Sequence, residues 1–324
     1  MINSELKFTL EEVLPKFPKD FQQKILHSVE FLRKAEKLAL AYDKENGFYL
    51  STSMGKDSQC LYHITKLAGV KFKAHMALTS VDPPEVIRFG REQYPDVDFI
   101  KPSISIYNQA RKEGILPTRL MRWCCRIYKE GIGAGKVTLI GIRHTESRQR
   151  SYRKEVEISN HKYSGTLDGL DEFREKRNSQ KRGRPTHGGV HEINITNATD
   201  EHTIGCIRGH ESLIISPIIE WTDDEVWMFL KTLGIKYCKL YDEGYHRIGC
   251  LCCPMHGYRQ KLADCKRYPH IYKSWLKVID DIRNGGKLDT FGLTNKDYFD
   301  WWISGVGIEA WRNRRKQQTL NFKD

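Results

Sequence analysis

The feature that most constrains this chain is the loop STSMGKDS at Ser51–Ser58, which lies between an apolar run and a helix-like stretch. Such a strand–turn–helix unit aims free backbone N–H groups and the helix dipole at one place, which favours an anion. Lys56 adds a positive charge, and Asp57 and Ser58 can cap the helix or help to hold a metal–phosphate group. The loop does not match the Walker pattern G-x-x-x-x-G-K-[ST]. It predicts a phosphate site, with an ordinary strand-to-helix turn as the alternative.

Four of the nine cysteines form two pairs, the adjacent Cys124 and Cys125 and the C-x-x-C of Cys250 and Cys253. Thiolates are soft ligands that select zinc or iron–sulfur clusters. Four-cysteine zinc sites are common, but adjacent cysteines converge poorly on one small tetrahedral ion, whereas a cubane offers separate iron corners. The pattern therefore favours a [4Fe-4S] cluster over zinc, and buried unligated thiols are a further alternative.

The remaining cysteines give no second pattern. A disulfide framework is not expected, because nine cysteines are spread over a chain of 324 residues with no secretory segment at its start. No apolar run approaches the ~18 residues of a membrane helix. We therefore expect a cytoplasmic protein without a membrane partner. Four scattered cysteines are interpreted as structural: Cys60, Cys206, Cys238 and Cys265. Cys252 is interpreted as a packing residue, with an exposed thiol that carries sulfur as the alternative.

The loop and the cysteine pairs together resemble the phosphoadenosine-phosphosulfate (PAPS) reductase family, in particular its iron–sulfur branch. That branch includes adenylyl-sulfate reductases and the ATP pyrophosphatases of DNA phosphorothioation (DndC- and SspD-like proteins). The loop is similar to the pyrophosphate loop S-x-G-K-D-S of adenine-nucleotide α-hydrolases. Further motifs follow in family order from about residue 46 to 256: LTSVDPPE at 78–85, GIRHTES at 141–147, SPIIEWTDDEVW at 216–227 and YDEGYHRIGC at 241–250.

The resemblance implies that the chain cleaves ATP with Mg²⁺ and adenylates an oxygen that sulfur then replaces. Lys56, Asp57 and Arg143 would be catalytic, with Arg143 facing the α-phosphate or the acceptor. The nucleotide-binding residues would be Ser51, Ser53, Gly55, Lys56, Asp57, Ser58, Thr79, Asp82 and Arg143. The cluster ligands would be Cys124, Cys125, Cys250 and Cys253, with Lys129 nearby. A cysteine-desulfurase-type sulfur donor and other modification proteins would be partners.

Two departures from the family pattern bear on function. Met54 replaces a common loop glycine, which predicts a side chain near the nucleotide, and no cysteine follows Cys265 where reductases carry a C-terminal catalytic thiol. We therefore expect an ATP pyrophosphatase that releases no sulfite by itself. The alternatives are a sulfonucleotide reductase that uses an external thiol, and a nucleotide-sensing, DNA-binding regulator with zinc at the four cysteines.

The charge of the chain favours a polyanionic partner beyond the nucleotide. The formal net charge is +12, with basic runs at 174–177, at 181–184 and at Arg312, Arg314, Arg315 and Lys316. Such runs are usually solvated faces, but the overall excess makes DNA our preferred acceptor.

The hydrophobic pattern predicts an α/β fold with a mostly parallel sheet. The resemblance implies that this sheet is doubly wound, as in adenine nucleotide α-hydrolase-like proteins. The expected strands are 48–52, 72–79, 97–100, 137–142 and 213–215. We divide the chain into an N-terminal helical segment (1–45), a nucleotide and cluster domain (46–256) and a C-terminal helical, aromatic-rich, basic region (257–324). The central domain carries a loop-rich basic insertion at about 151–210.

Overall fold

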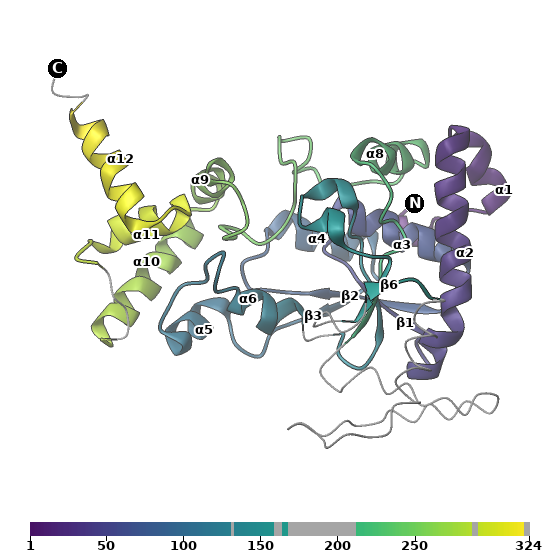
Figure 1. The fold of residues 1–324 in the computed structure, drawn as a ribbon, viewed down its shortest axis with the longest axis horizontal. Coiled ribbons are helices and arrows are strands. Elements are labelled where there is room, and N and C mark those ends of the chain that lie inside the picture. Colours follow the sequence, from purple (N-terminus) through teal and green to yellow (C-terminus); the bar gives the residue numbers. More distant parts are fainter. Residues whose placement is uncertain (131–132, 159–163, 168–211, 287–290, 321–324) are drawn as a thin grey trace. The chain divides into compact units, whose positions relative to one another are not determined.

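The computed structural model describes residues 1–130, 133–158, 164–167, 212–286 and 291–320 (Figure 1). The chain divides into two compact units. Unit 1 comprises Met1–Ala77, Pro84–Ile100 and Glu130–Ile248, and unit 2 comprises Leu78–Pro83, Lys101–Lys129 and Gly249–Asp324. The predicted domain boundaries near residues 45 and 256 stay a prediction.

Unit 1 is built on a seven-stranded sheet with strand order β3-β2-β1-β4-β7-β5-β6. The first five strands of this order pair in parallel, and β5 and β6 add an antiparallel edge. The order reverses between β1 and β4, and ligands of open α/β sheets bind at such a reversal, beyond the carboxyl ends of the strands. The strands are β1 Phe48–Ser51, β2 Phe72–Ala77, β3 Asp98–Ile100, β4 Val137–Leu139, β5 Val156–Ile158, β6 Ser164–Gly165 and β7 Leu213–Ile215.

The central strands form because they are almost continuously apolar, as strands covered on both faces are. Leu50 of β1 lies opposite Ala74 of β2 and Leu139 of β4, and all three are buried. The predicted α/β class with a mostly parallel sheet and its five predicted strands are confirmed. The β5–β6 hairpin was not predicted, and most of the predicted insertion lies outside the described residues.

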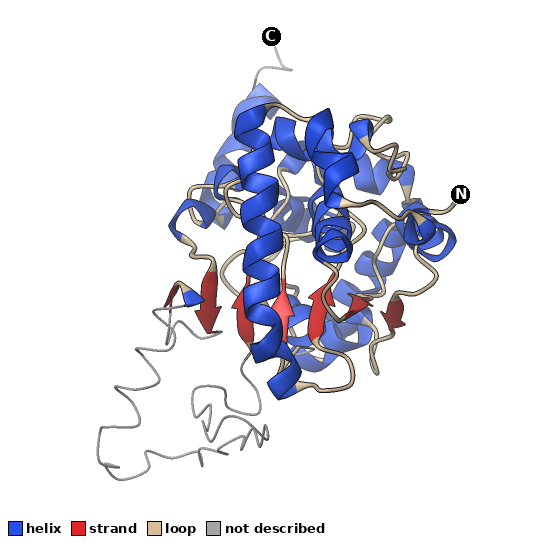
Figure 2. Ribbon diagram, turned by 90° about the vertical axis from the view of Figure 1, so that its right-hand side faces the viewer, coloured by secondary structure: helices blue, strands red, loops and turns tan. Residues whose placement is uncertain are grey.

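Helices of unit 1 pack on the sheet and on one another (Figure 2). The helix α2 contacts α3 as well as β1 and β4, and α3 contacts α8. The predicted helical spacing of Phe21, Ile25, Val29 and Leu32 is confirmed, because all four are buried along α2. The helices of this unit are α1 Leu10–Val13, α2 Lys19–Tyr42, α3 Lys56–Ala68, α4 Pro84–Gln93 and α8 Asp223–Thr232, with 3-10 turns at Asn3–Glu5, Leu14–Lys16, His144–Glu146 and Arg150–Tyr152.

Unit 2 is helical and has its own aromatic core. Trp275 of α10 packs against Trp302 of α11, with ring centroids 5.1 Å apart, and the indole N–H of Trp302 donates to the carbonyl of Pro117. These tryptophans are buried, so the interpretation of the C-terminal aromatics as core is confirmed for them. The helices are α5 Ile106–Glu113, α6 Trp123–Cys125, a π-helical turn Arg126–Glu130, α9 Tyr258–Arg267, α10 Pro269–Asn284, α11 Asn295–Ser304 and α12 Ile308–Leu320.

Over the part of the chain that the structure describes, no helix combines the length and the apolar character needed to cross a bilayer.

Two glycines of unit 1 provide a matched test of the packing around β1. Gly47 and Gly69 have φ angles of +67° and +70°, but a Cβ on Gly47 would lie 2.2 Å from the Lys71 carbonyl oxygen, whereas a Cβ on Gly69 would have nothing within 4 Å. We expect Gly69→Ala to lower the free energy of unfolding by about 1 kcal/mol from backbone strain alone. Gly47→Ala should lower it by about 3 kcal/mol, because a backbone clash is added. Urea unfolding followed by circular dichroism measures both, and equal losses would contradict the packing described.

Candidate functional site

The predicted phosphate loop connects the end of β1 to the start of α3. Ser51 is the last residue of β1, Gly55 is the N-cap of α3 and Lys56 is its first residue. The hydroxyl of Ser58 holds the loop closed, because it donates to the carbonyl of Gly55 at 2.9 Å and accepts from the backbone N–H of Ser53 at 3.2 Å. The hydroxyl of Thr52 also donates to Ser58, at 3.1 Å. The strand, tight turn and helix start predicted from the sequence are therefore all present.

Met54 takes a backbone conformation that favours glycine, with a φ of +57°. Its side chain is buried, and a Cβ added to Gly90 of α4 would lie 3.0 Å from the Met54 Cγ. The Met54 side chain therefore packs against α4 inside the core. The prediction that this side chain lies near the nucleotide stays a prediction.

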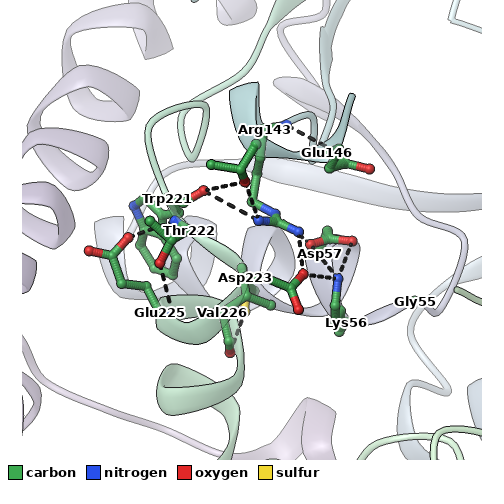
Figure 3. Close-up of polar contacts among 12 residues, drawn as sticks. Gly55, Lys56, Asp57, Arg143, Glu146, Trp221, Thr222, Asp223, Glu225 and Val226 are labelled. Carbon is green, nitrogen blue, oxygen red and sulfur yellow. Dashed lines mark hydrogen bonds and ion pairs between the residues drawn. The ribbon is translucent and has the colours of Figure 1, made fainter. Parts of the chain in front are cut away.

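Four charged side chains form a network of ion pairs at the start of α3 (Figure 3). The ammonium of Lys56 lies 3.3 Å from the Asp57 carboxylate and 2.8 Å from that of Asp223. The guanidinium of Arg143 contacts the same two carboxylates, with Nε 2.6 Å from Asp57 and Nη2 2.8 Å from Asp223. Two cations and two anions from three separate segments thus share one site.

Arg143 is 1% exposed, and its guanidinium makes four hydrogen bonds with its five N–H donors. Besides the two carboxylates, its Nη1 donates to the hydroxyl of Thr145 at 2.9 Å and to the carbonyl of Trp221 at 3.3 Å. Burial acts to lower the pKa of Arg143, but the charge of Asp57 and the other acidic neighbours outweighs it and raises the pKa. The guanidinium therefore stays charged in the interior.

Asp223 is a residue of this network that the sequence did not single out. It begins α8 directly after the N-cap Thr222, whose hydroxyl and the Glu225 side chain form a capping box. Burial acts to raise the pKa of Asp223, but hydrogen bonds and charge from Lys56 and Arg143 lower it overall. The sequence offered one signal for Asp223, an acidic residue at the start of a capped helix. It gave no indication of the partners of Asp223, because Lys56 and Arg143 are distant in the chain.

Tyr241 was also missed. Its hydroxyl accepts a hydrogen bond from the backbone N–H of Lys56 at 2.9 Å, across 185 positions of sequence. Its ring lies edge-on to Trp227, with centroids 4.9 Å apart. The first backbone N–H of α3, one of the groups expected to meet a phosphate, is therefore engaged by a tyrosine in this structure.

Gly141 lets the segment after β4 approach the phosphate loop closely. A Cβ at this position would lie 3.0 Å from the backbone oxygen of Asp57 and 3.3 Å from the backbone nitrogen of Ser58. The close approach places Arg143, two residues later, within reach of Asp57. It gives a physical reason for the glycine in the G-I-R motif.

In unit 2 the four predicted ligands, Cys124, Cys125, Cys250 and Cys253, line one pocket. The pocket is a small, partly open cavity of about 30 Å³, and Thr79, Lys129 and Cys252 also line it. Within the described ranges, no three His, Cys, Asp or Glu side chains are grouped so as to hold a metal ion. The structure thus brings both cysteine pairs to one cavity, and their role as ligands stays a prediction.

Electrostatic coupling links the cysteines to basic neighbours. The hydrogen bond with Cys124 lowers the pKa of the Cys125 thiol, and Arg122 and Lys129 act in the same direction. Burial and the neighbouring Cys250 raise the pKa of Cys253. The pKa of Lys129 is raised, chiefly by Cys250. A positive side chain therefore accompanies thiols that can carry negative charge.

Thr79 and Asp82, predicted on the nucleotide side, belong to unit 2 with the cysteines. The Asp82 carboxylate accepts from the backbone N–H of Thr79 at 2.6 Å and from its hydroxyl at 3.0 Å. Burial raises the pKa of Asp82 in spite of these bonds. The structure therefore brings the loop and Arg143 together in unit 1, and Thr79, Asp82 and the cysteines together in unit 2.

Comparison with known proteins gives distant relatives. An adenosine 5'-phosphosulfate reductase of Bacillus cereus is 23% identical over 230 residues, which cover 67% of this chain and 78% of that protein. Two uncharacterised proteins of Methanocaldococcus jannaschii are 34% identical over 65 residues and 26% identical over 100 residues. The chain covers only 16% and 18% of the length of these two proteins.

Solved structures with some likeness include two from yeasts. The FMN adenylyltransferase of Candida glabrata, in complex with FAD and inorganic pyrophosphate, aligns with a TM-score of 0.44 and 12% identity, over 74% of this chain and 68% of that one. The PAPS reductase of Candida auris aligns with a TM-score of 0.39 and 16% identity, over 76% of this chain and 97% of that one.

A family match covers the segment in which the sequence motifs occur. The phosphoadenosine phosphosulfate reductase domain matches residues 47–256, which is more than half of the chain. This segment contains the phosphate loop, Arg143, Asp223 and both cysteine pairs. The chain therefore belongs to the phosphoadenosine phosphosulfate reductase family.

Proposed function

We propose that the protein is an enzyme that cleaves ATP between the α and β phosphates and passes the adenylyl group to an acceptor. The observation that supports this most directly is the network at the start of α3. Lys56 and Arg143 are both buried, and their charges are balanced by the two carboxylates of Asp57 and Asp223. Buried cations beside a helix start, whose backbone N–H groups and dipole favour negative charge, are suited to a polyphosphate.

In the proposed reaction an acceptor oxygen attacks the α-phosphorus, and the bond from that phosphorus to the bridging oxygen breaks. Pyrophosphate leaves with the bonding electron pair, and the acceptor becomes adenylated. The start of α3 and Lys56 would stabilise negative charge on the leaving group, while Arg143 would face the α-phosphate. Asp57 and Asp223 supply the hard oxygen donors that Mg²⁺ prefers, and the ion would neutralise further phosphate charge.

The first test removes the charges of the loop. Lys56→Ala and Asp57→Ala should each reduce pyrophosphate release from ATP on the order of 100-fold or more, because both groups act on phosphate or metal. Lys73→Ala is the matched control, because Lys73 is an exposed lysine on β2 that pairs with Asp98. A coupled pyrophosphate assay measures all three.

Thermal unfolding of the same variants separates catalysis from folding. Near wild-type turnover in a folded Lys56→Ala or Asp57→Ala protein would refute the assignment of the phosphate site.

We propose DNA as the acceptor, in a sulfur modification of its backbone with a cysteine-desulfurase-type sulfur donor. The support is electrostatic: the net charge is +12, and Arg312, Arg314 and Arg315 are exposed on α12. Arg315 is partly neutralised by its ion pair with Asp297, and its guanidinium lies over the Trp311 ring. The basic runs at 174–177 and 181–184 lie outside the described residues.

A second candidate is a sulfonucleotide reductase that takes its thiol from another protein. It is favoured by the identity with the adenosine 5'-phosphosulfate reductase of Bacillus cereus, which extends over 230 residues. The two candidates differ in substrate and product, since only the reductase releases sulfite.

One anaerobic comparison of substrates separates the candidates. We expect pyrophosphate from ATP, stimulated by duplex DNA at about 50 mM salt and much less at about 200 mM, because phosphate contacts weaken steeply with salt. We expect no sulfite from adenylyl sulfate with a thioredoxin-type donor. Sulfite release would favour the reductase, and pyrophosphate release that DNA leaves unchanged at low salt would remove DNA as the acceptor.

We further propose that Cys124, Cys125, Cys250 and Cys253 hold a [4Fe-4S] cluster. The support is that both pairs line one pocket, with Lys129 beside them. Thiolate sulfur is the donor that such clusters take, and a nearby ammonium offsets the negative charge of a thiolate-ligated group. The cluster would supply redox or sulfur-binding capacity when bound.

Metal analysis of anaerobically prepared protein tests this assignment. We expect about four irons per chain with acid-labile sulfide and broad visible absorption, and serine at any of the four positions should bleach it. Cys238→Ser is the matched control, because Cys238 is a buried thiol of unit 1. One bound zinc without iron or sulfide would contradict the cluster and favour the nucleotide-sensing regulator.

A further inference from the structure

Two further thiols of unit 2 lie against each other. The Sγ atoms of Cys252 and Cys265 are 3.4 Å apart. Cys252 belongs to the loop between the predicted ligands Cys250 and Cys253, and Cys265 belongs to α9. Neither thiol has a role in the chemistry proposed above.

The backbone around Cys252 is held in an uncommon conformation. Its φ is +54°, in the left-handed region that residues with a side chain seldom adopt. The conformation is stabilised by Asp264, a buried residue of α9 whose carboxylate accepts from the Cys252 N–H at 2.9 Å and from the Gln260 side chain at 3.0 Å. Because Asp264 directly precedes Cys265, the same turn of α9 fixes the Cys252 backbone and presents the second thiol to it.

We propose that Cys252 and Cys265 form a peroxide-sensitive dithiol that closes to a disulfide between the Cys250–Cys253 loop and α9. The oxidant is a hydroperoxide, with hydrogen peroxide as the simplest case. The Cys265 sulfur attacks one peroxide oxygen, the O–O bond breaks, and a sulfenic acid and water form. The Cys252 sulfur then attacks the Cys265 sulfur and releases a second water, so that two thiols and one peroxide give one disulfide and two waters.

The geometry sets the order of these steps. Cys265 is partly exposed, whereas Cys252 is 1% exposed, so that peroxide meets Cys265 first. The hydrogen bond from Cys252 lowers the pKa of the Cys265 thiol, although burial and the charges of Asp264 and Asp300 oppose it. Closing the bond to the usual length of about 2.0 Å needs a displacement of about 1.4 Å, within reach of a loop and a helix side chain.

The disulfide would change the cysteine pocket through one of the residues that line it. Cys252 itself lines the pocket with the four predicted ligands. Its side chain would be tied to α9, and the wall between Cys250 and Cys253 would lose its freedom to move. The pair is therefore placed to report peroxide to that pocket, whether the pocket holds a cluster, a zinc ion or neither.

Peptide mapping tests the proposal on the full chain. The protein is prepared anaerobically, treated with stoichiometric hydrogen peroxide, quenched in acid, alkylated with N-ethylmaleimide and digested with trypsin. Cleavage after Arg247, Arg259, Lys261 and Lys266 leaves Cys265 alone in peptide 262–266 and the other three cysteines of the region in peptide 248–259. We expect these two peptides to be linked in roughly half of the chains or more, through Cys252 on fragmentation, and to separate after dithiothreitol.

Two variants and a control make the result decisive. In Cys265→Ser, Cys252 should be alkylated and the link lost. In Cys252→Ser, peptide 262–266 should instead carry sulfenic acid, which a second equivalent of peroxide converts to sulfinic acid. Cys238→Ser should cross-link like the wild type. A link from Cys265 to Cys250 or Cys253 would overturn the proposal. It would also be overturned if Cys252 and Cys265 were both alkylated at a peroxide dose that already oxidises the other cysteines.

Discussion

The guanidinium of Arg143 is the contact on which the candidate site depends. It joins the segment after β4 to Asp57 at the start of α3 and to Asp223 at the start of α8, and it also bonds the Trp221 carbonyl. Buried and surrounded by acceptors, it fixes where two helix starts lie relative to the sheet. Removing one partner of such a network leaves an uncompensated charge in the interior, which is far costlier than losing a surface ion pair. The geometry of the candidate site and the local stability of the fold are therefore coupled at this residue.

That coupling explains several sequence features at once. Gly141 allows the backbone after β4 to touch the Asp57 backbone, and the Ser58 hydroxyl keeps the loop closed from inside. Met54 accepts a left-handed backbone and packs its side chain into the core beside Gly90. The loop is thus built rigidly, and its charged groups are balanced before any ligand arrives, as a preorganised electrostatic site requires.

The sequence predicted what depends on local pattern and missed what depends on distant contacts. The five parallel strands were predicted because each is short and mainly apolar, and the strand–turn–helix at Ser51–Ser58 because its residues are consecutive. Asp223 and Tyr241 were missed because their partners lie 80 and 185 positions away. The pairing of β5 with β6 was missed because the two strands have only three and two residues, too few for a periodic pattern to be recognised. The pairing of Cys252 with Cys265 likewise depends on how α9 packs, although both cysteines were visible as isolated residues.

The hydrogen bond between Tyr241 and the first N–H of α3 has a consequence for how tightly the loop can hold anything. That N–H has a single proton, already accepted by a hydroxyl at 2.9 Å, so any oxygen that takes it enters by exchange rather than into an open place. The net contribution of this N–H to the affinity for an anion is then the difference between two hydrogen bonds. A tyrosine that returns as the anion departs would favour release of product, a property that a turnover cycle needs and that tight binding alone would oppose.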